Sequence, residues 1–356
     1  MQRALMTGIL SFVTVLTLLT GWTSGVAMAA DPGLVDSDNW RRFQTVFIRQ
    51  GGRVVDNGNN DISHSEGQGV GMLIAEAQGD RATFDRLWGW TKANLQVRDD
   101  ALFAWKWTES SADHVPDHNN ATDGDIFIAW SLTRAAKRWP DGSYQAAAAT
   151  IAGDIRKKLG RVIAGQRYLI AGATGFEHDD VITVNLSYWI FPALRPLMDV
   201  DPSSEWDEIQ RSGLTLLDKA KFGRWKLPAD WMTVKSDGSV SLAPDHPARF
   251  GYDAVRVPLY LVWSGLATDE RLKSFVGFWS EFGNFPFLPA WTNLTDDSIA
   301  SYGGSAGYKA VAELTRVAAH KPDTLPQATA LDDKSDYYSS TLSMMVRMAI
   351  LANSTN

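Results

Sequence analysis

The sequence predicts a mainly α-helical protein, and three observations support this fold class. Apolar residues recur at intervals of three and four along most of the chain after Trp40, which is the spacing of amphipathic helices. Strand-like alternation is confined to a few short pieces. No unit of fixed length repeats, which argues against a solenoid. We therefore expect ten or more helices to form a closed ring of helical hairpins.

The predicted helices share this apolar spacing, and several follow a residue that can cap a helix. The segments cover residues 39–47, 84–95, 122–139, 144–159, 184–197, 202–219, 252–263, 269–282, 299–320 and 335–352. Candidate N-caps are Asp80, Asp201 and Thr268. Strand signal is limited to residues 168–170 and to a hairpin in which 231–234 faces 240–242 across an Asp-Gly turn. We expect this small β-hairpin as an insertion in the helical domain.

Composition narrows the function classes. The chain has 356 residues, of which 45% are hydrophobic and 21% charged, and it has no Cys, which excludes a disordered chain and a disulfide scaffold. Its net charge is −7 and the basic residues form no run, so we expect no nucleic-acid partner. The 15 Trp are unusual, because exposed indole rings stack on the apolar faces of sugars. Most of them must nevertheless pack in the core.

The N-terminus has the pattern of an export signal. Arg3 precedes an apolar stretch, and Ala27-Met28-Ala29 has the small-x-small form of a cleavage site. We therefore expect a signal peptide over residues 1–29, a single domain over 30–356, and a secreted or periplasmic protein. An uncleaved membrane anchor is the alternative.

Glu66 lies in the first of three acidic motifs, in the run ISHSEGQGVGM of residues 62–72. Ser63 or Ser65 can cap a helix that opens here. The three alternating glycines would let a ligand approach the backbone beside this carboxyl. The alternative is that the glycines serve close helix packing and that Glu66 complements the positive end of its helix.

The other two motifs each contain a pair of charged residues. The second motif is Ala121-Thr122-Asp123-Gly124-Asp125, in which one acid can cap a helix while the other faces a cleft. The alternative is that both acids cap the helix or form a calcium-like loop, although the spacing of an EF-hand is missing. Asp253 and Arg256 lie three residues apart and would be neighbours on a helix, which is also compatible with an ordinary ion pair.

Two further patterns lack the context that their chemistry needs. The Gly-Gly-Ser-Ala-Gly run of residues 303–307 follows no apolar strand, so a hydrolase nucleophile elbow is not expected. His114 and His118 have no third ligand at a recognisable spacing. We expect neither a metal nor an organic cofactor.

Together, the three acidic motifs resemble those of the glycoside hydrolase family 8 endoglucanases, and the likeness spans most of the mature chain. It is closest to the exported cellulases associated with bacterial cellulose synthesis. The resemblance implies an (α/α)6 barrel with a substrate groove across one end. It also implies that Glu66 is the general acid, that Asp253 is the general base that activates water, and that Asp123 grips the sugar next to the scissile bond.

The same resemblance suggests how the substrate is held. Arg256 and Tyr252 flank the base, and Trp105, Tyr188 and Trp231 are candidate sugar platforms. The implied activity is that of an inverting endo-β-1,4-glucanase, in which one carboxyl stays protonated and the other ionised. We expect a monomer that acts on β-1,4-glucan and has a functional link to a cellulose synthase complex. The alternatives are a non-catalytic glucan-binding accessory protein, or a sister hydrolase of xylan, chitosan or mixed-linkage glucan.

Overall fold

The structure is a computed structural model that describes residues 37–284, 286–320, 331 and 335–354. All of them belong to one compact unit, Gly33–Asn356. The predicted signal peptide lies outside the described residues. No helix in the described ranges is long and apolar enough to cross a bilayer.

The described ranges contain eleven α-helices, as the mainly helical prediction requires. The helices are α1 (Ser37–Phe47), α2 (Ser65–Ala77), α3 (Arg81–Leu95), α4 (Thr122–Arg138), α5 (Gly142–Asp154), α6 (Phe191–Val200), α7 (Glu205–Lys219), α8 (Arg256–Trp263), α9 (Asp269–Glu281), α10 (Ala306–His320) and α11 (Tyr337–Ser354). A π-helical turn extends α5, and a 3-10 turn precedes α6.

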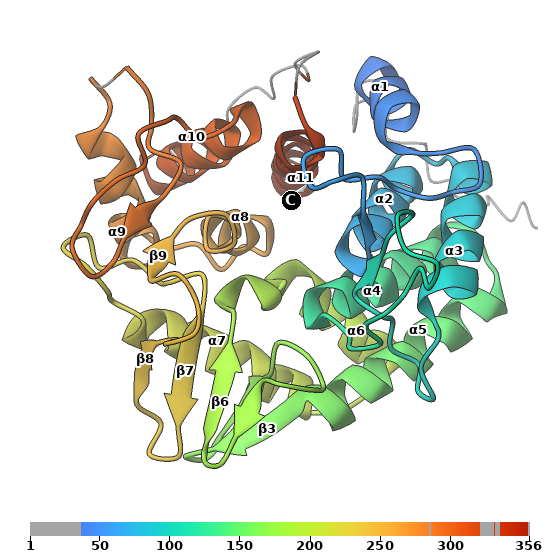
Figure 1. Cartoon of the computed structure of the whole chain (residues 1–356), viewed down its shortest axis with the longest axis horizontal. Coiled ribbons are helices and arrows are strands. Elements are labelled where there is room, and N and C mark those ends of the chain that lie inside the picture. The colour runs from blue at the N-terminus through green and yellow to red at the C-terminus, as the bar shows by residue number, and fades with distance from the viewer. Residues whose placement is uncertain (1–36, 285, 321–330, 332–334, 355–356) are drawn as a thin grey trace, which may run out of the picture. The chain divides into compact units, whose positions relative to one another are not determined.

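Five of these helices close a ring (Figure 1). Helix α2 packs against α4, α4 against α6, α6 against α8, α8 against α11, and α11 against α2. Helix α10 contacts both α8 and α11, while α3, α5, α7 and α9 pair with α2, α4, α6 and α10 respectively. This arrangement confirms the predicted barrel of helical hairpins. A ring of this kind places the N-terminal ends of several inner helices together.

The predicted β-hairpin is present, but it belongs to a larger antiparallel sheet. The strands are β5 (Glu177–His178), β6 (Val181–Val184), β7 (Met232–Lys235) and β8 (Val240–Leu242), in that order across the sheet. Three short two-stranded pairs complete the described strands: β1 (Ser63–His64) with β2 (Lys106–Trp107), β3 (Gly160–Ile163) with β4 (Gln166–Leu169), and β9 (Arg249–Phe250) with β10 (Thr292–Asn293).

The helix predicted over residues 184–197 is wrong in its first half. Its first residue, Val184, is the last of strand β6 (Val181–Val184), in which Ile182 and Val184 are buried and the other two residues half-buried, and Leu186–Tyr188 is a 3-10 turn. Helix α6 begins only at Phe191. A run of four β-branched residues is too short for its period to separate strand from helix, so the pairing of β6 with β7 decides the outcome.

Two predicted caps are confirmed and one is wrong. Asp80 accepts the backbone N–H of Thr83 at 3.0 Å, and Thr268 accepts that of Arg271 at 3.3 Å. Asp201 does not cap α7, which begins later; it is the C-cap residue of α6, and its carboxylate binds the Arg156 guanidinium. A long-range ion pair therefore overrides the local start signal.

Candidate active site

Three acidic side chains from three separate elements meet at one end of the ring. Glu66 lies in the first turn of α2, Asp123 in the first turn of α4, and Asp253 in the turn before α8. Arg256, the first residue of α8, joins them: its Nη1 donates to Glu66 Oε1, and its Nη2 donates to Asp253 Oδ1 at 2.7 Å. The structure thus brings together the four residues that the three sequence motifs singled out.

The guanidinium lies beneath the two carboxylates. The Arg256 side chain is 6% exposed, whereas those of Glu66 and Asp253 are 22% and 27% exposed. Its Nη2 also donates to Ser187 Oγ at 3.2 Å. Solvent and substrate can therefore reach both carboxyl groups while the positive charge stays buried below them.

Close contact between α2 and α4 sets Asp123 beside Glu66. A Cβ added to Gly124 would lie 2.0 Å from Ser65 Oγ and 2.7 Å from the backbone N of Glu66. A Cβ added to Gly69 would lie 2.6 Å from Phe127 Cβ. Only glycine allows the two helices to approach this closely.

The glycines of the first motif face protein rather than a ligand surface. Added Cβ atoms at Gly67 and Gly71 would meet the Tyr337 hydroxyl at 3.1 Å and Val54 at 2.9 Å. The packing alternative is therefore correct, and the expected ligand approach along the glycines is wrong. A spacing of glycines cannot reveal which neighbour approaches them.

His64 caps α2, not the expected Ser63 or Ser65. Its Nδ1 accepts the backbone N–H of Gly67 at 3.0 Å, and its Nε2 lies 3.5 Å from Asp56 Oδ2. The ring also meets Tyr337 edge-on, with centroids 5.4 Å apart. Histidine is an uncommon cap, so local sequence rules favoured the neighbouring serines.

Asp230 is a residue that the sequence analysis missed. Its buried Oδ1 accepts the backbone N–H groups of Gly251, Asp253 and Ala254 at 3.0, 3.2 and 2.9 Å. These bonds hold the turn that presents the Asp253 carboxyl. Helix α8 begins at Arg256 rather than at residue 252 as predicted, because the N–H groups of Arg256 and Val257 bond three residues back, to the carbonyls of Asp253 and Ala254, as in a turn. Asp230 lies in a short Ala-Asp-Trp stretch with no motif around it, so no sequence signal marks it.

The electrostatic environment of Asp123 favours its protonated form. Burial raises the pKa of Asp123 to about 7, and the negative charge of Glu66 adds to the rise, against the attraction of Arg256. Its Oδ1 accepts the backbone N–H of Gly124 at 2.8 Å. Near neutral pH this carboxyl can therefore donate a hydrogen bond.

Asp253 loses its proton more readily than Asp123. Burial raises the pKa of Asp253 to about 6, with Arg256 opposing the rise and the charges of Asp230 and Glu66 adding to it. The attraction of Arg256 therefore only partly offsets the effect of burial on Asp253. Asp253 is mainly ionised at pH 7 and loses its charge on mild acidification.

Asp125 has a structural role, and neither acid of the second motif caps α4 through its side chain. The buried Asp125 carboxylate accepts the backbone N–H of Phe103 at 2.9 Å and the Asn120 amide at 2.7 Å. Burial raises the pKa of Asp125 well above its usual value. The described residues contain no group of His, Cys, Asp and Glu that could hold a metal ion.

Trp105 and Trp231, two of the candidate sugar platforms, differ in the groups that pack against each ring. Trp105 is half-buried beside the start of α2, where its carbonyl accepts the Ser65 N–H and its indole donates to Asp117 at 2.8 Å. Trp231 is stacked against Phe176 and His246, with centroids 5.8 and 4.4 Å away. Their roles as sugar platforms stay predictions, with Trp231 the more enclosed of the two.

Tyr188 lies near Asp123 and Asp253, and Tyr252 immediately precedes Asp253 in the chain. Burial raises the pKa of Tyr188 well above its usual value, and the charges of Asp123 and Asp253 add to the rise, so the phenol stays a neutral donor near the acids. The Tyr252 hydroxyl lies 2.6 Å from that of Tyr302.

Tyr302 and Trp291 extend the aromatic surface and were missed in the sequence. Trp291 Nε1 donates to the Tyr302 hydroxyl at 3.2 Å, and the Tyr302 side chain is 49% exposed. Both lie in the segment between α9 and α10, far along the chain from the acidic motifs. The high proportion of aromatic residues was the only available signal.

Comparisons with known proteins agree on one family. The model of the glycosyl hydrolases family 8 matches residues 8–351. The chain is 40% identical over 314 residues to a probable endoglucanase of Novacetimonas hansenii, covering 88% of this chain and 90% of the relative. An endoglucanase of Cellulomonas uda is 36% identical over 278 residues, covering 78% and 76%.

A solved structure gives the same result. The endo-β-1,4-glucanase CMCax from Acetobacter xylinum matches with a TM-score of 0.83 and 39% identity, covering 89% of this chain and 98% of that one. The barrel, the three converging acids and these similarities agree. The chain belongs to the glycosyl hydrolases family 8 and is a glycoside hydrolase.

Proposed function

We propose that the protein is an endo-β-1,4-glucanase that cuts cellulose or a related β-glucan internally and with inversion. The observation that carries the proposal is the convergence of Glu66 and Asp253 on Arg256, with Asp123 beside them. Relatives named as endoglucanases, at 36–40% identity over most of the chain, support the substrate class.

The mechanism needs one acid that gives a proton and one that takes a proton. In the proposal, Glu66 protonates the glycosidic oxygen as the bond between that oxygen and the anomeric carbon breaks. Asp253 takes a proton from a water molecule whose oxygen forms the new bond to that carbon from the opposite side. The products together contain one added water.

The charge balance of the site is compatible with this division. Three carboxyl groups surround one guanidinium, so removing every proton would leave a net negative charge in a largely buried cluster. Such a cluster retains protons at a pH where isolated carboxyl groups are ionised. Asp123, with a pKa of about 7, can then donate a hydrogen bond to a hydroxyl of the sugar next to the scissile bond.

The anomeric configuration of the first product tests whether Asp253 acts as the general base. Proton NMR of fresh hydrolysate should show the α-anomer first, because water attacks a β-linked carbon from the opposite side. An initial β-anomer would instead make Asp253 or Asp123 a nucleophile and would contradict an inverting mechanism.

The substrate is tested by a panel of polysaccharides. Carboxymethyl cellulose should lose viscosity early, while few reducing ends have formed, because an endo-acting enzyme cuts inside the chain. Faster hydrolysis of xylan or chitosan would show that the substrate assignment is wrong. Absence of hydrolysis on every substrate would favour the non-catalytic glucan-binding alternative.

The cellular setting follows from the N-terminal pattern and from the family. We propose export with cleavage after residue 29, action as a monomer, and a role beside a cellulose synthase complex. Mass spectrometry of the exported protein would reveal the cleavage site. Light scattering during chromatography would give the oligomeric state.

A further inference from the structure

Asp230 lies under the turn that carries the proposed base, and both of its carboxylate oxygens accept hydrogen bonds. Its Oδ1 accepts three backbone N–H groups of that turn, among them the N–H of Asp253 at 3.2 Å. Its Oδ2 accepts the Arg249 Nε–H at 2.9 Å. The Asp230 side chain is 1% exposed. Four donors, one of them a guanidinium, give the bonding pattern of an ionised carboxylate.

Holding the turn does not by itself require a negative charge. The amide oxygen of an asparagine also accepts backbone N–H groups, so an asparagine could fill this part of the role. The carboxylate of Asp230 adds a buried charge that is in direct contact with the backbone of Asp253. Because little water reaches this charge, solvent screens it weakly, and it acts on the Asp253 carboxyl more strongly than a surface charge would.

Two buried charges of opposite sign act on Asp253. Arg256 binds its carboxylate at 2.7 Å and favours the ionised form, whereas the charge of Asp230 favours the protonated form. The other ionisable groups near Asp253 are Glu66 of α2, Asp123 of α4, Tyr188 of the 3-10 turn, Tyr260 of α8 and Tyr338 of α11. Burial raises the pKa of all three tyrosines, so they stay neutral in acid solution. Of the acids, Asp230 alone has no part in the proposed proton transfers or in binding the sugar.

The opposing charges decide how good a base Asp253 is. A general base must be ionised at the working pH and must still bind a proton well. A carboxylate that met only the guanidinium of Arg256 would take a proton from water poorly. Burial and the charge of Asp230 act in the opposite direction, and the pKa of Asp253 is raised to about 6. At that value Asp253 binds a proton about a hundred times more tightly than an ordinary aspartate and is still mainly ionised at pH 7.

We propose that Asp230 is a positioning residue with an electrostatic role: it holds the turn that presents Asp253, and its buried negative charge keeps Asp253 a strong base beside Arg256. The inference rests on the proposed function, in which Asp253 is the general base. The alternative is that Asp230 only fixes the turn and pairs with Arg249. The two roles differ in what happens to the proton affinity of Asp253 when the charge is removed and the shape is kept.

Asp230→Asn makes that change. The amide oxygen can keep the backbone bonds, and Arg249, whose side chain is 31% exposed, can turn to solvent. Carbon-13 NMR of aspartate-labelled protein follows the ionisation of Asp253, whose signal is identified by its loss in Asp253→Asn. These titrations use the Glu66→Gln protein, so that Glu66 does not ionise beside the base. Without the negative charge Asp253 holds its proton less tightly, so its titration midpoint should fall by about one pH unit. With Glu66 restored, the acid limb of kcat/KM on carboxymethyl cellulose should move to lower pH as well.

Arg249→Gln should have the opposite effect. It removes the positive charge beside Asp230 and leaves the backbone bonds of the turn in place, so the midpoint of Asp253 should rise. The rise should be smaller than the fall in Asp230→Asn, because Arg249 is partly exposed and solvent screens its charge. Arg249→Gln also provides the test if Asp230→Asn does not fold.

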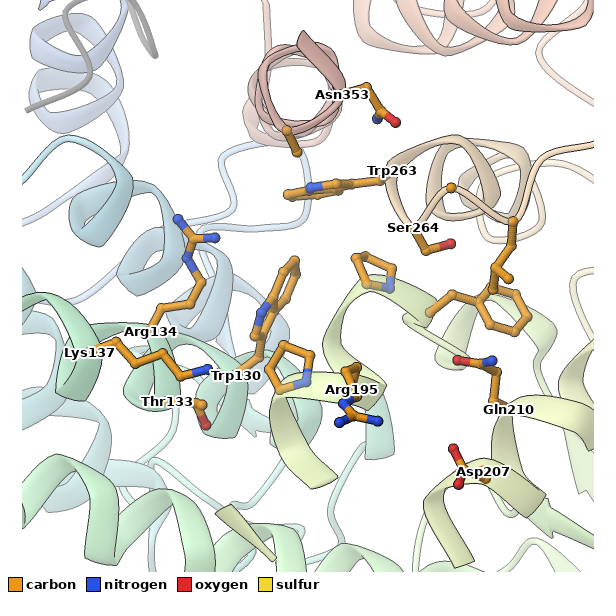
Figure 2. A pocket seen from close by; sticks show the side chains of 16 residues that line it. Trp130, Thr133, Arg134, Lys137, Arg195, Asp207, Gln210, Trp263, Ser264 and Asn353 are labelled. Atoms are coloured by element: carbon orange, nitrogen blue, oxygen red, sulfur yellow. The ribbon is translucent and has the colours of Figure 1, made fainter. Parts of the chain in front are cut away.

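Asp141→Asn is the matched control. Asp141 has the same kinds of partner as Asp230, since it accepts the backbone N–H of Ser143 at 3.0 Å and binds Arg81 at 3.0 Å. It follows α4 at the end of the ring opposite to the acids, where Lys137 lines a cavity of about 620 Å³ (Figure 2). Helix α4 separates that end from Asp123 by about 20 Å. The control should leave the midpoint and the acid limb unmoved.

Each result bears on one of the two proposals. A lower rate at every pH in Asp230→Asn, with an unmoved midpoint, would show that Asp230 only fixes the turn and would overturn the inference. An unmoved midpoint in Arg249→Gln would overturn it if Asp230→Asn does not fold, and so would an equal shift in Asp141→Asn. If the NMR midpoint moves as expected but the acid limb does not follow it, or if the wild-type protein cuts no β-glucan, the proposed function is overturned instead.

Discussion

A single guanidinium, that of Arg256, binds two carboxylates that are 190 and 3 residues away in the sequence. Because it is buried beneath Glu66 and Asp253, it offsets their mutual repulsion and orients both groups. Both acids and this arginine could be singled out by motif in the sequence. Asp230 and His64 could not, because their roles depend on contacts that only the fold creates.

Neutral replacements at the two carboxylates measure their catalytic roles. Glu66→Gln and Asp253→Asn should each lower the rate of reducing-sugar release from carboxymethyl cellulose at least about a hundredfold, the scale expected for losing an acid or a base. Glu270→Gln, on the exposed surface of α9, is the control and should keep full activity. Near wild-type activity in either variant would remove that residue from the mechanism.

Asp123 should make stability depend on pH. Its pKa rises from 3.8 in the unfolded chain to about 7 in the folded protein. Below about pH 4 the carboxyl is protonated in both the folded and the unfolded state, so it does not lower the free energy of unfolding. The loss in the free energy of unfolding grows as the pH rises from about 4 to 7, and it is fully present above pH 7.

Asp123→Asn removes that ionisation. Between pH 4 and pH 8, the free energy of unfolding of Asp123→Asn should gain about 2 to 4 kcal/mol relative to wild type. Urea titrations at several pH values give the difference. Parallel pH profiles for the two proteins would show that Asp123 is not buried as described.

Among the elements, the crossing of α2 and α4 determines the distance between Glu66 and Asp123. The sequence indicated both helices and their acidic first turns. It could not show that Gly69 and Gly124 face each other's helix, because the pattern of glycines is equally typical of a ligand-binding loop. Of the four-stranded sheet, only the β7–β8 hairpin was predicted. Strand β6 is too short for its alternation of buried residues to identify it, and only its pairing with β7 does so.

Gly124→Ala tests this crossing. The added Cβ would meet Ser65 and the backbone N of Glu66, which cannot rotate away, so the helices must separate. We expect a loss of about 1–3 kcal/mol in the free energy of unfolding, together with a lower kcat. Gly277→Ala in α9, where a Cβ meets nothing within 4 Å, is the matched control and should add about 0.5–1 kcal/mol. Equal effects from the two substitutions would contradict the close crossing.

For the whole molecule, the sequence predicted the ring and its helices because amphipathic spacing persists over many turns. Boundaries such as the start of α8 could not be predicted, since the turn before it is held by the side chain of Asp230, more than 20 residues earlier in the chain. Closure of the ring was expected because the sequence has no repeat that would make a solenoid, and the family resemblance implied its (α/α)6 form. Spacing alone does not say which helices touch.

Because the ring is closed, its last helix, α11, is needed to hold α2 and α8 in place. Helix α11 contacts both α8 and α2. At its start, the backbone N–H of Tyr337 donates to Asn57 Oδ1 at 2.9 Å, and its ring packs on Phe47 and on His64, which caps α2. The next residue, Tyr338, donates from its hydroxyl to the carbonyl of Tyr252 at 2.9 Å, beside the base.

A chain that ends at residue 336 should therefore fail to form the native barrel, even though the missing helix carries none of the three acids. Removing α11 exposes apolar faces of α2 and α8 together, which no local rearrangement can cover. We expect the shortened chain to lose its near-ultraviolet circular dichroism and its cooperative thermal unfolding, whereas a chain ending after residue 354 should keep both. A shortened protein that still unfolds cooperatively, with detectable hydrolysis of carboxymethyl cellulose, would show that the ring does not need this closure. In that case the position of Glu66 would depend on its own helix pair, α2 and α4, rather than on the complete barrel.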